Sequence, residues 1–107
     1  MKDYVCIATW NPIFEMMRYH WVHKSEKDPV QSIRKFKNCI WNIHIEDIKD
    51  KKHFHLIPGQ GDMDFTKIFK VLREIKYDNF ITVELYTYQK QPVSAARKSY
   101  DFLNRFI

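Results

Sequence analysis

Two segments of this chain place polar side chains where apolar ones are the default. His44, Glu46 and Asp47 stand in the run NIHIED, and Glu84 stands in the run TVELY. Imidazole nitrogen and carboxylate oxygen together suit Mn²⁺, Mg²⁺, Co²⁺ or Zn²⁺ as ligands. The residue types therefore indicate a divalent-metal site, if the fold brings them together.

Both runs are predicted to close β-strands, at 39–45 and 80–86. Strand alternation puts His44 and Glu46 on one face, and Asp47 opens the following loop. An unpaired buried carboxylate is costly, so Glu84 needs a cation or a strong hydrogen-bond donor. Two plainer interpretations stay open: His44 as a hydrogen-bonded core residue, and Glu84 as a solvent-facing edge residue. Spacing alone predicts only an α/β domain with a His/Glu site.

The remaining pattern alternates strands and helices. Asp28-Pro29 and Asp64 are predicted helix starts, because Asp can cap free N–H groups. The predicted order is strand 4–10, helix from 28, strand 39–45, long polar loop 46–61, helix from 64, strand 80–86 and helix 94–106. Such alternation predicts βαβ units with a parallel sheet, whose chemistry lies at the strand C-terminal ends.

The bulk composition narrows the function classes. The chain has 107 residues, 45% hydrophobic and 16% aromatic, so it can bury a core. The net charge of +5 contains no block of like charges, which favours a lysine-covered surface over nucleic-acid binding. Cys6 and Cys39 without CxxC spacing, no long apolar run and no secretion signal predict a reduced, cytoplasmic protein without a membrane span.

Four motifs in order give the chain a family resemblance. Residues 28–107 resemble the closing segment of the xylose isomerase-like TIM barrels, which include sugar phosphate isomerases/epimerases, inosose-type enzymes and AP endonuclease family 2-like proteins. The motifs are His44-Ile45-Glu46-Asp47, the run 58–65 (PGQGDMDF), Lys76-Tyr77-Asp78-Asn79 and Val83-Glu84. The final helix around 95–99 is also similar, whereas Asn79 replaces a family glycine.

The resemblance implies an α/β fold: a partial (β/α) TIM barrel of about three parallel strands with helices, the closing βα units of a barrel. It assigns 28–107 to these units and leaves 1–27 as an N-terminal segment with an expected strand at 4–10. A complete barrel of this type takes about 250 residues. The chain is therefore expected to be an incomplete, fragment-like barrel with exposed edges.

The resemblance also implies site roles. His44 and Glu84 match two of the family's four metal ligands, and Glu84 matches a carboxylate that moves a proton next to a carbonyl. Gly59 and Gly61 are expected to let the loop turn tightly near the site. The family's other ligands lie on earlier strands and have no recognisable counterpart here.

Further candidates for contact with substrate follow the second strand, although a solvated basic loop is the alternative for the last three of them. These candidates are Glu46, Lys52, His53 and His55.

Three functions are thus expected, in descending order. The first is a sugar or sugar phosphate isomerase/epimerase-like enzyme using a divalent metal. The second is a non-catalytic barrel remnant or protein-interaction module. The third, nucleic-acid binding, is least favoured. An incomplete barrel would favour a homo-oligomer or a partner chain that completes it, with Trp10, Met16, Met17 and Trp21 as a candidate contact patch.

Overall fold

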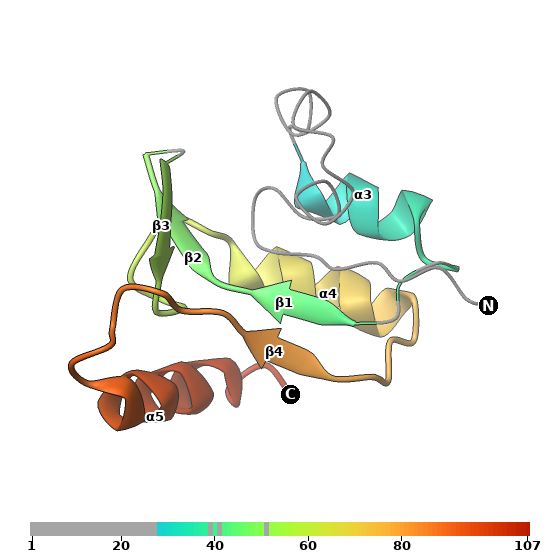
Figure 1. The fold of residues 1–107 in the computed structure, drawn as a ribbon. Helices are drawn as coiled ribbons and strands as arrows, with labels where there is room; N and C mark the ends of the chain where they lie inside the picture. The colour runs from blue at the N-terminus through green and yellow to red at the C-terminus, as the bar shows by residue number, and fades with distance from the viewer. Residues whose placement is uncertain (1–27, 39, 41, 51) are drawn as a thin grey trace.

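The computed structural model describes residues 28–38, 40, 42–50 and 52–107 (Figure 1). The expected strand at 4–10 and the patch formed by Trp10, Met16, Met17 and Trp21 lie outside these residues. The elements in the described part are α3 (Pro29–Lys35), β1 (Ile43–Ile45), β2 (Asp47–Lys49), β3 (Lys52–Leu56), α4 (Phe65–Glu74), β4 (Ile81–Val83) and α5 (Pro92–Leu103).

Two helices begin where the sequence predicts. The Asp28 carboxylate accepts the backbone N–H of Val30 at 2.9 Å, and Pro29 takes the first helical position of α3. Asp64 accepts the N–H of Lys67 at 3.1 Å at the start of α4. This backbone hydrogen bond holds the pKa of Asp64 below its ordinary value. Both predicted caps are confirmed.

The end of α4 uses a left-handed residue. Lys76 has φ 55°, the N–H of Tyr77 donates to Leu72 O at 2.9 Å, and the N–H of Lys76 donates to Arg73 O at 3.0 Å. These two bonds form a Schellman motif, which usually places glycine at the left-handed position. The motif turns the chain from α4 toward β4.

The two predicted chemistry-bearing strands are neighbours. β1 and β4 pair in parallel, with His44 opposite Thr82 and Ile45 opposite Val83. Both are shorter than the predicted ranges 39–45 and 80–86. Figure 1 shows them side by side, with α4 connecting them as a crossover. The described strands do not close a barrel, so this α/β structure is part of a TIM barrel.

One face of the parallel pair forms the core. Ile43 and Ile45 are each only 2% exposed, and Ile81 and Val83 pack against the same cluster. All three helices contribute to it. The buried members from the helices are Ile33 of α3, Phe65, Ile68, Phe69, Val71 and Leu72 of α4, and Leu103 of α5. The intervening residue His44 lies on the other face, as strand alternation requires.

The prediction of one continuous irregular loop over 46–61 was wrong. This stretch contains an antiparallel hairpin, in which Asp47 of β2 pairs with Leu56 of β3 and Lys49 pairs with Lys52. Its strands are short and polar, so they lack the apolar alternation that indicates a strand. Two strands of the described part are therefore parallel, and the other two form this hairpin.

No helix in the described ranges combines the length and apolar character needed to cross a membrane.

Candidate active site at the polar edge

The carboxyl ends of β1 and β4 bring His44 and Glu84 into contact. Their Nδ1 and Oε2 atoms lie 3.1 Å apart, although the residues are 40 positions apart in sequence. The N–H of Glu84 donates to Ile45 O at 3.0 Å, which continues the parallel pairing past the end of β4. About a quarter of each side chain is exposed, 26% for His44 and 25% for Glu84. The pair is therefore held by the sheet yet open to a ligand.

Asn42 fixes the protonation pattern of His44. The side-chain amide Nδ2 of Asn42 lies 3.1 Å from Nε2 of His44. Because an amide nitrogen only donates, Nε2 accepts this bond and the proton sits on Nδ1. Nδ1 then donates to Glu84. Both ring nitrogens are thus occupied by protein groups in this arrangement.

Glu84 is held as an anion. Its Oε1 accepts a hydrogen bond from the Tyr86 hydroxyl. Burial raises the pKa of Glu84, but the hydrogen bonds from Tyr86 and His44 and the charges of His44 and His55 outweigh burial, so the pKa lies below its ordinary value. A carboxylate with a lowered pKa is a good cation ligand and a weak base.

A second polar pair lies beside the first. Glu46 is fully buried, at 0% exposure, and its Oε2 forms an ion pair with Nδ1 of His55. The His55 ring meets the Tyr86 ring nearly edge to face, with 4.4 Å between centroids and 70° between planes. The two pairs thus join into one cluster. We call it the polar edge: Asn42, His44, Glu46, His55, Glu84 and Tyr86.

Substrate contacts by the candidate residues stay predictions. The Glu46 carboxylate faces His55 within the protein, and the His55 side chain is 17% exposed. The side chains of Lys52 and His53 lie outside the described residues.

Asp47 holds the following loop rather than opening toward a ligand. Its Oδ2 accepts the N–H groups of Gly59 at 2.8 Å and Gly61 at 2.9 Å, and its Oδ1 accepts those of Ile48 at 2.9 Å and Met63 at 3.1 Å. Only 1% of Asp47 is exposed. Sequence reasoning named Asp47 but not this role, because its bonds reach up to 16 positions along the chain.

The two loop glycines are sterically required. Gly59 has φ 95°, a conformation that side chains disfavour, and a Cβ there would meet the Phe102 ring. A Cβ at Gly61 would collide with the Ile48 carbonyl and the Asp47 carboxylate. The glycines therefore let the loop backbone close onto Asp47.

The donor chemistry of the His44–Glu84 pair fits a divalent metal. Two ligands at right angles with bonds of about 2.1 Å stand about 3 Å apart, which is close to the 3.1 Å between Nδ1 and Oε2. A hard divalent ion takes about six donors, however. The described part of the chain contains no group of three or more His, Cys, Asp or Glu residues able to hold a metal. The pair alone supplies two donors.

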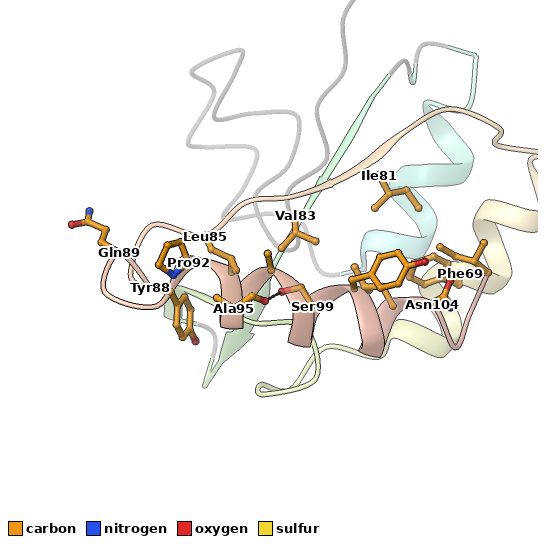
Figure 2. A pocket seen from close by; sticks show the side chains of 14 residues that line it. Phe69, Ile81, Val83, Leu85, Tyr88, Gln89, Pro92, Ala95, Ser99 and Asn104 are labelled. Atoms are coloured by element: carbon orange, nitrogen blue, oxygen red, sulfur yellow. Dashed lines mark hydrogen bonds between the residues drawn. The ribbon is translucent and has the colours of Figure 1, made fainter.

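The opposite face of β4 carries a different feature, an apolar groove against α5 (Figure 2). Its volume is about 580 Å³, and Ile81, Val83 and Leu85 line one side of it. Ala95, Ser99 and other α5 residues line the other side, where the Ser99 hydroxyl donates to Ala95 O at 2.8 Å. Glu84 does not line the groove, so groove and polar edge are separate.

Comparison with known proteins gives a consistent result. A family model described as "Xylose isomerase-like TIM barrel" matches residues 5–106. An inosose dehydratase of Clostridium tetani is 34% identical over 77 residues, which covers 56% of this chain and 26% of that protein. Those of Clostridium perfringens and Clostridium beijerinckii are 30% and 33% identical over 82 residues, each match covering 61% of this chain and 27% of the relative. The chain thus spans about a quarter of the length of these curated relatives.

Proposed function

This chain belongs to the xylose isomerase-like TIM barrel family, and on that basis we propose that it contributes to a metal-assisted, sugar isomerase/epimerase-like active site. The observation that carries the proposal is the 3.1 Å contact between His44 and Glu84. The contact lies at the carboxyl ends of neighbouring parallel strands, where TIM-barrel enzymes keep their catalytic residues.

In this proposal, His44 and Glu84 are two ligands of a divalent ion, either Mn²⁺, Mg²⁺, Co²⁺ or Zn²⁺. The ion would polarise a carbonyl and the neighbouring hydroxyl of the substrate. The other ligands come from outside the described residues, because these contain no larger ligand group. Asn42 orients the His44 ring, and Tyr86 orients the Glu84 carboxylate.

The proposed catalytic role of Glu84 is to accept a proton from the carbon next to the substrate carbonyl. Its lowered pKa keeps it ionised, and therefore able to accept, at neutral pH. Both oxygens already accept hydrogen bonds from His44 and Tyr86. Proton uptake thus requires one of these bonds to be exchanged for a substrate contact.

The proposed substrate is a sugar, a sugar phosphate or a similar polyhydroxy ketone. The relatives are named inosose dehydratases, and removal of water from a hydroxy ketone can also begin with loss of a proton next to the carbonyl. The same first step would therefore serve isomerisation, epimerisation and dehydration.

Calorimetric titration with Mn²⁺ tests the proposal. The wild-type chain is expected to bind Mn²⁺, and His44→Ala and Glu84→Gln are each expected to weaken binding at least tenfold. Glu74→Gln removes a carboxylate from the exposed pair with Arg34 and is the matched control, with unchanged affinity. Absence of wild-type binding, or equal binding by all four proteins, would contradict the proposal.

A second experiment addresses the reaction itself. The chain is incubated with a ketose and Mn²⁺ in D₂O, and proton NMR follows deuterium incorporation next to the carbonyl. Incorporation that depends on Glu84 is the expected result. Incorporation equal to that with Glu84→Gln would remove Glu84 from the proton-transfer role.

The alternative function is a non-catalytic barrel remnant or interaction module. It is favoured by one observation: His44 and Glu84 satisfy each other by a hydrogen bond, without an ion. This alternative predicts no thermal shift with Mn²⁺ and unchanged stability for His44→Ala and Glu84→Ala. The homo-oligomer or partner chain expected from the sequence also stays a prediction, which sedimentation velocity tests.

A further inference from the structure

The buried pair Glu46–His55 has no role in the proposed chemistry. Glu46 is completely buried, and its carboxylate meets the His55 imidazole. Burying two charges costs much of the free energy that their attraction returns, so such a pair contributes little net stability. Its position beside the His44–Glu84 pair suggests a role in the site instead.

The backbone of His55 is also unusual. Its φ is 50°, in the left-handed region that non-glycine residues rarely adopt. Strained backbone of this kind clusters at functional sites, where the surrounding structure holds it in place. Here the ion pair with Glu46 ties His55 to the segment between β1 and β2.

The contacts of His55 lead directly to Glu84. The His55 ring lies against the Tyr86 ring at 4.4 Å, and the Tyr86 hydroxyl donates to Oε1 of Glu84. Tyr86 itself is 58% exposed. A half-exposed ring has many accessible orientations, so contact with a fixed neighbour favours the orientation that reaches Glu84.

We propose that Glu46 and His55 are positioning residues that hold the Tyr86 hydroxyl on Glu84. The buried Glu46 carboxylate anchors the His55 ring, the His55 ring restrains Tyr86, and Tyr86 orients the carboxylate that faces His44. The β2–β3 hairpin is thereby coupled to the end of the parallel sheet. The inference rests on the proposed function only for the importance of Glu84.

NMR of the metal-free chain at neutral pH tests this coupling. The signals are the ¹³Cδ shift of Glu84 and the side-chain ¹⁵N shifts of His44. Tyr86→Phe removes the hydroxyl and sets the reference change. Glu46→Gln and His55→Gln are each expected to move the Glu84 signal in the same direction, by at least half of that change.

A double-variant comparison separates positioning from general destabilisation. When Tyr86 is already phenylalanine, adding Glu46→Gln is expected to shift the Glu84 signal no further, because the connection to Glu84 is already broken. Additive shifts, or a Glu84 signal that stays at its wild-type position in Glu46→Gln and His55→Gln, would overturn the inference.

Two controls keep the result interpretable. A single substitution leaves one charge buried without its partner, so the double variant Glu46→Gln/His55→Gln removes both charges and is the better-folding test. Arg34→Gln/Glu74→Gln neutralises an exposed ion pair between α3 and α4 and is expected to leave both signals unchanged. Circular dichroism confirms folding of each protein.

The outcome is independent of the proposed metal chemistry. Coupling in a chain that binds no Mn²⁺ would support the positioning role while the proposed function fails. Mn²⁺ binding without coupling would overturn the positioning role alone.

Discussion

The two faces of β4 and its extension make opposite kinds of contact. Ile81, Val83 and Leu85 line the apolar groove against α5, whereas Glu84 and Tyr86 belong to the polar edge. The period of two along an extended chain assigns alternate residues to the two sides. One short segment therefore serves both packing and the candidate site.

The difference between these faces lies in how far each contact depends on geometry. Apolar packing against α5 is non-directional and scales with the area removed from water. The polar edge depends on named donor–acceptor pairs, and a buried polar group that loses its partner costs free energy. We therefore expect polar-edge substitutions to act at specific partners, and groove substitutions to act in proportion to burial.

The largest expected effect is that of Asp47→Ala, next to the polar edge. The N–H groups of Gly59, Gly61 and Met63 would each lose an acceptor, at about 1–3 kcal/mol per unsatisfied buried group. We expect the free energy of unfolding to fall by on the order of 3–6 kcal/mol, measured by urea denaturation.

Asp47→Asn provides the comparison for that loss. It retains one acceptor oxygen and should fall between wild type and Asp47→Ala. A cost below about 1 kcal/mol for Asp47→Ala would show that the loop does not depend on these bonds.

On the apolar side, Leu103→Ala should cost about 2–5 kcal/mol, as is usual for a buried leucine. Leu103 is 6% exposed and belongs to the main core. Val93→Ala, on the same helix at 72% exposure, should stay within about 0.5 kcal/mol of wild type. Equal losses for the two variants in urea denaturation would mean that burial does not control stability on this face.

The smallest expected effect is the pH dependence contributed by Glu84. Its pKa in the folded chain lies below the unfolded value, which is about 4.3 for Glu. The carboxylate therefore stabilises the fold above that pH, and this contribution is lost as the pH falls through the lower, folded pKa. The urea midpoint of wild type should exceed that of Glu84→Gln at neutral pH.

Acid titration of that difference supplies the check. The gap between the two urea midpoints should narrow as the pH falls below about 4.3. A gap that is constant with pH would indicate that Glu84 contributes through packing alone. Glu74→Gln, measured over the same range, shows how an exposed carboxylate behaves.

The sequence alone determined the features that depend on local periodicity. Asp28 and Asp64 were recognisable as helix starts because capping needs only a neighbouring backbone N–H. The parallel strands around His44 and Glu84 followed from alternating strand and helix patterns, and the structure places them side by side. Their metal and catalytic roles remain proposals.

Only the tertiary structure decided which partners the other polar residues have. Asp47 binds three N–H groups 12 to 16 positions away, and Glu46 meets His55 across a hairpin whose turn includes Asp50 at φ 52°. Residue periodicity carries no information about such contacts, because irregular backbone breaks the repeat that relates position to direction. The fold brings these groups together through turns that local patterns do not specify.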